Sequence, residues 1–437
     1  MLFSDFLKAL FAALREQGVR FCILRNYEEF PARNVGGDVD FLIDRSQLAA
    51  ALRAVHSISG IRIVGLTERA YVTGVFLAGA SSTAGSRCLQ LDFIWILSWK
   101  QMPFLPAEAV LQSAVPREAG ELNFLVPLPA HEAITSLLMG LLYGGRAKEK
   151  YLSKVRQSFA ACREEIIAAL RPQFGLKATT RLMEAVTGGD LGKIDACAGP
   201  LRFSLCWRCL LRRPLGSVRG VLWYYKREIA VRLLPKNVDT ICILDPDGGA
   251  QAEVIDELMP RLRYAAKVVH RRHFSLRPPL PPEPTGSTPS QPVPAGSFAS
   301  VKAVAGWMVQ EWRDHFVKRT DTLRIFDNDF HGLLIEPQRY GYSGPLWFAR
   351  LAGRMLPPPS LWILLQPEGT NPQPGNPAAA ASANGERIEA YRKFVATRKN
   401  HVILDAGMPP AVLAEESFSA IVNRLEQRVD KRLRRSL

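Results

Sequence analysis

Two aspartates separated by one residue open an apolar segment near the N-terminus, Gly36-Gly37-Asp38-Val39-Asp40-Phe41-Leu42-Ile43. Because side chains alternate between the two faces of a β-strand, Asp38 and Asp40 are expected on one face, with the residues between and after them in the core. A third carboxylate, Asp92, lies inside the apolar run Leu89–Ile94 and can reach the same face. The pattern predicts a sheet that carries three carboxylates together.

Neighbouring carboxylates repel each other and raise each other's pKa, so they are tolerated best around a cation. Three of them suit Mg²⁺ or Mn²⁺, and two such ions about 3.5–4 Å apart would activate an attacking oxygen and stabilise a leaving group. In the alternative interpretation, Asp38 caps a turn after the two glycines, and Asp40 and Asp92 are solvated strand residues. The glycine pair, the apolar run and the third aspartate favour the metal site.

Residues 21–43 resemble the nucleotidyltransferase fold of the DNA polymerase beta superfamily, and within it an uncharacterised bacterial branch. The resemblance implies that Asp38 and Asp40 are the metal-binding pair and that Asp92 is the third catalytic carboxylate. Magnesium and a nucleoside triphosphate are the cofactor and substrate implied.

The same resemblance places Gly36, Gly37 and Arg25 near the triphosphate. One departure concerns the residues that hold the nucleotide. Most members of the superfamily carry Gly-Ser shortly before the aspartate pair, and the serine contacts phosphate. Here Leu24-Arg25-Asn26-Tyr27 stands in that place, so the element that binds the nucleotide is non-standard.

A further match covers His131–Tyr151. Leucines at helical spacing predict one apolar helix face, and a Gly-Gly break then precedes a basic cluster that contains Lys148 and Lys150. In the related family this segment donates basic residues to the substrate phosphates. The alternative is a helix end with solvated lysines.

A second phosphate-binding pattern begins after the apolar strand Thr240–Leu244 and precedes a helix expected from about Glu253. A working loop has the pattern Gly-x-x-x-x-Gly-Lys-Ser/Thr, in which backbone amides and Lys bind phosphate and the hydroxyl binds Mg²⁺. The four defining positions are here Asp245, Ala250, Gln251 and Ala252. The strand, loop and helix of such a site are expected, but the glycines, the lysine and the hydroxyl that bind phosphate and Mg²⁺ are missing.

The order of elements in this half resembles the thymidylate-kinase-like branch of the P-loop kinases. The matching segments are Ile325–His331, where Asn328 replaces the family arginine, then Leu361–Leu365 and Val402–Ala406. The lid position, Glu368–Asn384, contains no Lys or Arg. We interpret this half as a pseudo-kinase with the fold kept and phosphoryl transfer lost, which leaves nucleotide, lipid or protein binding open. A kinase that uses Asp247 and Asp327 in another geometry is the less favoured alternative.

Length and composition are those of a globular chain of two or three domains, with 437 residues and 22% charged residues. No apolar run approaches the roughly 20 residues of a membrane span, and the N-terminus lacks the layout of a signal peptide. Seven scattered cysteines suggest free thiols, and a lone Cys206-x-x-Cys209 makes a poor zinc site. The expected location is the cytoplasm, with peripheral binding to the inner membrane as an option.

The formal charge of +15 is concentrated between Arg202 and Lys236, where nine cations accompany the single acid Glu228. Tryptophans, tyrosines and leucines alternate with these cations. Such a segment can be a helical connector, can lie on an anionic membrane surface, or can bind a nucleic-acid backbone.

The predicted fold class is α/β, in four segments. A mixed nucleotidyltransferase-type sheet spans residues 1–125, a helical extension 126–200, the basic amphipathic connector 201–236 and a parallel-sheet kinase-like domain 237–437. Pro278–Pro294 is expected to be an extended loop inside the last domain.

The function predicted from these features is transfer of an NMP from an NTP to an acceptor that the sequence does not identify. Bacterial proteins with this domain pair tend to accompany capsule or lipopolysaccharide assembly, so a glycan, lipid-linked glycan or phosphate is an expected acceptor by association. One alternative is a catalytically inactive, nucleotide-sensing or scaffold protein. Another is a toxin-like transferase that modifies RNA or protein.

Overall fold

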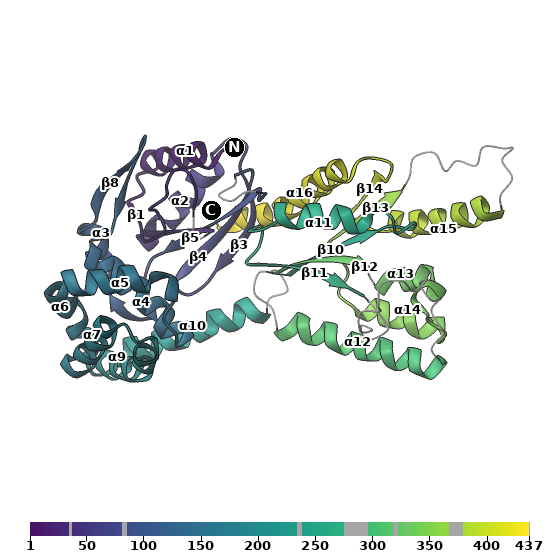
Figure 1. Cartoon of the computed structure of the whole chain (residues 1–437). Coiled ribbons are helices and arrows are strands. Elements are labelled where there is room, and N and C mark those ends of the chain that lie inside the picture. The colour runs from purple at the N-terminus through teal and green to yellow at the C-terminus, as the bar shows by residue number, and fades with distance from the viewer. Residues whose placement is uncertain are drawn as a thin grey trace. The chain divides into compact units, whose positions relative to one another are not determined.

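The structure is a computed structural model that describes residues 1–34, 37–80, 85–233, 238–274, 296–317, 322–328, 330–366 and 379–436. The chain is an α/β protein that divides into two compact units (Figure 1). Unit 1 contains residues 1–231 and 429–437, and unit 2 contains residues 232–428. The finer boundaries expected at residues 125, 200 and 236 stay predictions.

Unit 1 contains a mixed five-stranded sheet with the order β1-β2-β5-β4-β3. β2 and β5 are parallel, whereas the other neighbours are antiparallel. The strands are β1 (Phe21–Ile23), β2 (Asp38–Ile43), β3 (Arg62–Glu68), β4 (Val72–Ala78) and β5 (Cys88–Ile94). Two short hairpins follow, β6 (Leu97–Trp99) with β7 (Met102–Leu105), and β8 (Val115–Ala119) with β9 (Leu122–Val126).

The two faces of this sheet have separate cores. α1 (Phe3–Glu16) and α2 (Leu48–His56) cover one face, because their apolar stripes pack on Val39, Phe41 and their neighbours. On the other face, Leu42 and Ile94 belong to a core shared with the helices that follow. These are α3 (Ala107–Gln112), α4 (Pro129–Gly144), α5 (Glu149–Ala161), α6 (Arg163–Phe174), α7 (Leu176–Gly188), α8 (Leu191–Ala196), α9 (Ala198–Arg212) and α10 (Pro214–Leu233).

Unit 2 is built on an all-parallel five-stranded sheet with the order β11-β12-β10-β13-β14. Its strands are β10 (Val238–Leu244), β11 (Val268–His273), β12 (Thr322–Asn328), β13 (Leu361–Gln366) and β14 (His401–Asp405). The helices are α11 (Gln251–Arg261), α12 (Ser297–Val317), α13 (Phe330–Ile335), α14 (Leu346–Met355), α15 (Ala379–Ala396) and α16 (Pro410–Ser436), whose last residues belong to unit 1. Continuous apolar strands such as β13 are typical of a parallel sheet buried on both faces.

Across the described residues, no helix is both long and apolar enough to cross a membrane.

Candidate metal centre

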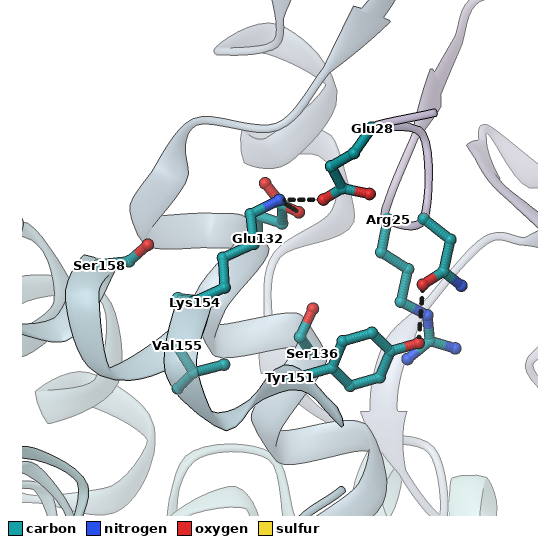
Figure 2. A pocket seen from close by; sticks show the side chains of 10 residues that line it. Arg25, Glu28, Glu132, Ser136, Tyr151, Lys154, Val155 and Ser158 are labelled. Atoms are coloured by element: carbon teal, nitrogen blue, oxygen red, sulfur yellow. Dashed lines mark hydrogen bonds and ion pairs between the residues drawn. The ribbon is translucent and has the colours of Figure 1, made fainter. Parts of the chain in front are cut away.

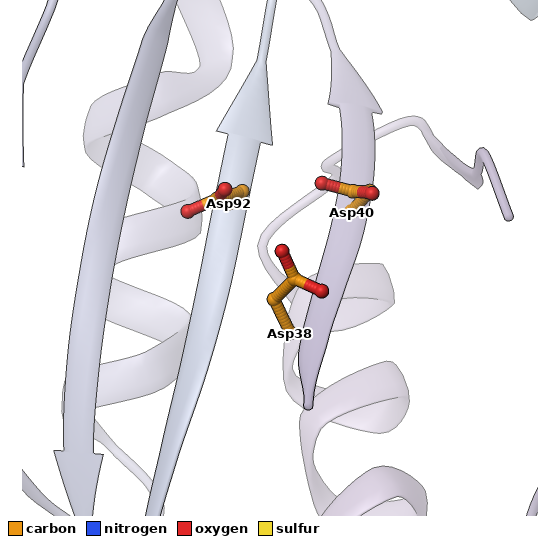
Figure 3. A group of neighbouring side chains, drawn as sticks. All are labelled: Asp38, Asp40 and Asp92. Carbon is orange, nitrogen blue, oxygen red and sulfur yellow. The ribbon is translucent and has the colours of Figure 1, made fainter. Parts of the chain in front are cut away.

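The three aspartates singled out in the sequence meet on one face of the unit 1 sheet (Figure 3). Asp38 and Asp40 come from β2, and Asp92 lies directly opposite Asp40 on the parallel strand β5. One carboxylate oxygen from each aspartate lies within 4.8 Å of the other two. In the part of the chain that the structure describes, no other group of three acidic, histidine or cysteine side chains comes together in this way.

Strand alternation explains why these side chains share a face. Val39 and Phe41 point into the core under α1 and α2, so Asp38 and Asp40 point away from it. On β5 the same alternation directs Leu91 and Phe93 into that core and Asp92 to the other face of the sheet. The interpretation of Asp40 as a solvated strand residue is wrong, because only 1% of its surface is exposed.

The turn before β2 and a glycine on β4 shape the space around the carboxylates. Asn34 donates a hydrogen bond of 2.6 Å to the backbone oxygen of Asp38, and Gly37 adopts a φ of 78°, which favours glycine. Gly74 pairs with Asp92, and a Cβ at this position would lie only 3.2 Å from Asp92 Oδ1. A glycine inside a strand often marks such a close approach. Gly74 therefore leaves the Asp92 carboxylate room to lie among the others.

Arg25 is the nearest cation in this site. Its Nε donates a hydrogen bond of 2.5 Å to Asp40 Oδ2, and both side chains are buried. Burial by itself lowers the pKa of Arg25, but the charges of Asp40, Tyr151 and Asp38 raise it, so the guanidinium stays charged. The resemblance places Arg25 near a triphosphate, whereas here it forms an ion pair with one of the expected metal ligands.

The remaining electrostatics of the site suit a divalent cation. Burial, and then the charge of Asp40, raises the pKa of Asp38 to about 6, although Arg25 and Lys148 act in the opposite direction. Gln90 donates a hydrogen bond of 2.9 Å to Asp92 Oδ1 and orients that carboxylate. Because all the donors are oxygens and Arg25 neutralises only one charge, the residues fit Mg²⁺ or Mn²⁺.

The predicted basic residues lie at the start of α5. Lys148 precedes α5 and is exposed, yet its charge reaches Asp38. Lys150 is also exposed, and its Nζ lies 4.7 Å from the centre of the Tyr151 ring. Gly140 permits the turn between α4 and α5, because a Cβ at this glycine would lie 3.2 Å from the backbone oxygen of Arg146.

Two residues of α5 extend the site beyond what the sequence predicted. The Tyr151 hydroxyl donates a hydrogen bond of 3.1 Å to Asn26 Oδ1, and the Arg25 guanidinium lies 5.6 Å from the centre of the Tyr151 ring. Lys154 forms an ion pair of 2.5 Å with Glu28 and a second ion pair with the buried Glu132. Tyr151 and Lys154 are three residues apart, which places them on one helix face, and this spacing is visible in the sequence.

These side chains line a small cavity between the Arg25–Glu28 segment and helices α4 and α5 (Figure 2). Its free volume of about 20 Å³ has room for a water molecule and not for a nucleotide base. The cavity lies among the hydrogen bonds and ion pairs that join the Arg25–Glu28 segment to α4 and α5. We therefore place no substrate inside it.

In the second phosphate-binding pattern, in unit 2, the backbone amides bind the carboxylate of Asp245. Asp245 Oδ1 accepts hydrogen bonds from the backbone N–H groups of Asp247 and Gly248 at 3.0 and 2.9 Å. Asp245 Oδ2 accepts from those of Ala250 and Gln251 at 3.0 and 3.1 Å. Backbone amides at the start of a helix are a typical phosphate site. Here the Asp245 carboxylate lies among them.

Two arginines that the sequence analysis did not identify hold this loop. Arg339 donates hydrogen bonds of 3.2 and 3.0 Å to the backbone oxygens of Asp245 and Pro246. Arg387, on α15, forms an ion pair of 2.8 Å with Asp247. Both contacts link segments far apart in the sequence, which is why local patterns did not reveal them.

Several predicted features lie outside the described residues. They are Gly36, the side chain of Asn328, the Pro-rich segment Pro278–Pro294, residues 368–378 of the lid segment and the side chains of its residues 379–384. No protein-family model matches this sequence, and a comparison with curated proteins finds no significant match.

Proposed function

We propose that unit 1 is a metal-dependent nucleotidyltransferase that moves an NMP from an NTP to an acceptor hydroxyl or phosphate. The observation that carries the proposal is the convergence of Asp38, Asp40 and Asp92 from two neighbouring parallel strands, with ligand oxygens within 4.8 Å. In such a reaction an acceptor oxygen bonds to the α-phosphorus, the bond to the bridging oxygen breaks, and pyrophosphate leaves. Carboxylate-bound Mg²⁺ or Mn²⁺ supplies charge neutralisation for both oxygens.

The protein's own groups have distinct tasks in this proposal. Asp38 and Asp40 hold the cation from one strand, and Gln90 orients Asp92 from the next. A carboxylate oxygen of Asp92 accepts the proton of the acceptor hydroxyl as the oxygen attacks. Arg25 fixes Asp40 and adds positive charge beside it.

The triphosphate is a polyanion, and the lysines at the start of α5 place positive charge on one side of the proposed site. Lys148 and Lys150 are exposed, at the residue before α5 and in its first turn. Long flexible lysine side chains act as point charges on phosphates. In the proposal they neutralise the β- and γ-phosphates, while Gly37 lets the backbone come close to the ligand.

For unit 2 we propose a supporting role without phosphoryl transfer. Its phosphate-binding pattern lacks the lysine and hydroxyl, and Asp245 accepts four backbone hydrogen bonds that would otherwise be open to a phosphate. A buried carboxylate repels a polyanion at that position. These features favour a pseudo-kinase over a kinase that uses Asp247 and Asp327.

A second candidate is an inactive protein that senses nucleotide, and the Arg25–Asp40 ion pair favours it. A guanidinium fixed at 2.5 Å from Asp40 competes with a metal ion for that carboxylate. In this case the arginine stabilises the acidic group permanently, and nucleotide binding needs no divalent cation.

A dual-label transfer assay separates the two candidates. Purified protein and a cell extract containing membranes and glycans receive each NTP, labelled at the α or the γ phosphate, with Mg²⁺ or Mn²⁺. Transfer of the α label alone is expected, and it should disappear in Asp38→Asn and Asp92→Asn. Asp44→Asn, an exposed position just after β2, is the matched control and should retain transfer.

The other outcomes are equally informative. Transfer of the γ label that depends on unit 2 would contradict the pseudo-kinase proposal. Nucleotide binding that is insensitive to chelation, without transfer of either label, would replace the transferase by the sensing protein.

A further inference from the structure

Helix α10 packs on the rest of unit 1 with one side and exposes apolar residues on the opposite side. Arg227 forms an ion pair of 3.0 Å with Glu68, and Val231 is buried. On the exposed side, Leu215, Val218 and Leu222 are 86%, 50% and 65% exposed. Large apolar residues that lie exposed in succession on one side of a helix are typical of an interaction surface. Its outer side therefore calls for a partner that α10 lacks within unit 1.

Helix α9 repeats the pattern immediately before it. Leu201 and Leu205 are buried in the helical core, whereas Phe203, Trp207 and Leu211 are 72%, 56% and 66% exposed. The exposed residues recur every four positions, so they form one stripe along the helix. Such large exposed apolar residues in succession, on two consecutive helices, mark an interaction surface rather than scattered surface residues.

The charges beside these stripes identify the partner. Arg212, Arg213, Arg219 and Lys226 are exposed, and Glu228 is the only acid between residues 196 and 236. Glu228 is buried and lies 3.8 Å from Arg69, so it does not offset the outer cations. The partner must therefore offer an apolar layer and negative charge together.

We propose that the outer sides of α9 and α10, here called the α9–α10 surface, bind an anionic lipid bilayer. Leucines, Phe203 and Trp207 enter the boundary between headgroups and acyl chains, while the neighbouring arginines contact lipid phosphates. A second copy of the chain fits less well, because pairing two such surfaces brings like charges together. Nucleic acid also fits less well, since a phosphate backbone gives exposed leucines nothing to bury into.

Vesicle sedimentation with the full chain tests this proposal. Vesicles of phosphatidylcholine alone are compared with vesicles of equal parts phosphatidylcholine and phosphatidylglycerol. The protein is expected to sediment with the anionic vesicles only, and high salt should release part of it. Protein that stays in the supernatant with both vesicles, or that binds both equally, would overturn the proposal.

Matched variants test the two parts of the surface separately. Leu215→Ser/Leu222→Ser should weaken vesicle binding by about tenfold, because it removes apolar groups that enter the bilayer. Leu176→Ser, at a leucine that is 57% exposed on another helix, is the control and should bind like the wild type. Arg213→Glu/Arg219→Glu should also lose about tenfold or more, with Arg163→Glu/Lys177→Glu as its control.

Two further results would assign the surface to another partner. A concentration-dependent dimer that the leucine variant abolishes, seen by analytical ultracentrifugation, would assign it to a second copy. Duplex or single-stranded DNA binding that survives the leucine change and is lost with the arginine change would assign it to nucleic acid. Circular dichroism melting of each variant, with an unchanged Tm, shows that lost binding does not reflect unfolding.

Discussion

At the scale of single residues, Asp40 is the most constrained group in the acidic site. It is 1% exposed, accepts a hydrogen bond from Arg25 and lies opposite Asp92. A buried charge is costly without a partner, so Arg25 and Asp40 each depend on the other. The same pair decides how strongly the site binds a cation, since Arg25 already satisfies part of the Asp40 charge.

Asp40→Asn is expected to destabilise the protein by roughly 3–5 kcal/mol, because it leaves the Arg25 guanidinium buried without a counter-charge. Urea denaturation measures the change in free energy of unfolding. Arg25→Met/Asp40→Leu removes both charges and should recover most of this loss. If Asp40→Asn is as stable as the wild type, the ion pair does not contribute to stability.

Gly74→Ala is expected to weaken Mn²⁺ binding with little effect on folding. The new Cβ would lie 3.2 Å from Asp92 Oδ1, so that carboxylate must shift away from the other two. Titration with Mn²⁺, followed by electron paramagnetic resonance, measures the affinity without requiring activity. Gly199→Ala is the control, because a Cβ there has no atom within 4 Å. Equal affinities in the two variants would argue against Asp92 as a ligand.

At the scale of secondary-structure elements, the connection from β10 to α11 depends on one carboxylate. Four backbone N–H groups between Asp247 and Gln251 donate hydrogen bonds to Asp245. Arg339 and Arg387 contact the same loop from other segments of the chain. The carboxyl end of a central parallel strand is the usual ligand position of an open α/β sheet. In this protein an internal interaction fills that position and fixes the loop.

Asp245→Ala should lower the stability of unit 2 by roughly 1.5–3 kcal/mol, because four N–H groups at a partly buried loop lose a charged acceptor. Calorimetry of the full chain measures the effect. Asp256→Ala is the control, since its side chain is 72% exposed and forms an ion pair with Arg271. A larger effect at Asp256 would mean that the loop does not rely on the Asp245 carboxylate.

The ends of β11 and β12 supply a pH-dependent contact. His273 Nδ1 lies 2.9 Å from Asp327 Oδ1, and Arg271 also forms an ion pair with Asp327. The hydrogen bond with Asp327 raises the pKa of His273 despite partial burial. Burial alone would raise the pKa of Asp327, but the hydrogen bonds from His273 and Arg271 lower it below its ordinary value.

The two pKa shifts define a pH range in which the contact between His273 and Asp327 stabilises the fold. The His273 contribution is complete below the ordinary histidine pKa of about 6.5 and is lost as pH rises through the raised pKa. The Asp327 contribution is complete above the ordinary aspartate pKa of about 3.9 and is lost as pH falls through the lowered value. The difference in free energy of unfolding between wild type and His273→Gln should thus be larger at mildly acidic pH than in alkali. Urea denaturation over a pH series measures this difference, and a constant value would contradict it.

At the scale of the whole molecule, the chain divides into two compact units with separate cores. Substitutions at distant positions without shared partners usually act independently. We therefore expect Asp245→Ala to speed amide hydrogen exchange in β10 and α11 and to leave β2 and β5 unchanged. Asp40→Asn should have the reverse pattern. Exchange that rises in both units after either substitution would show that the units are coupled.

Much of the site was predictable because it depends on local periodicity. Asp38 and Asp40 had to share a strand face, and the apolar residues around Asp92 indicated a second strand. Tyr151, Lys154 and Glu132 were not predicted as site residues, because their contacts join α4 and α5 to the Arg25–Glu28 segment. Arg339 and Arg387 were missed for the same reason, since each reaches the Asp245 loop from a segment about a hundred residues or more away.

The sequence by itself determined the α/β class, the shared face of Asp38 and Asp40 and the loss of the lysine and hydroxyl from the second phosphate-binding pattern. These follow from backbone geometry and side-chain chemistry within a few residues. Only the tertiary structure decided that Asp92 lies opposite Asp40, that Arg25 pairs with Asp40, and that Asp245 accepts the loop amides. Strand order and register depend on how all the apolar side chains pack together, and no local segment contains that information.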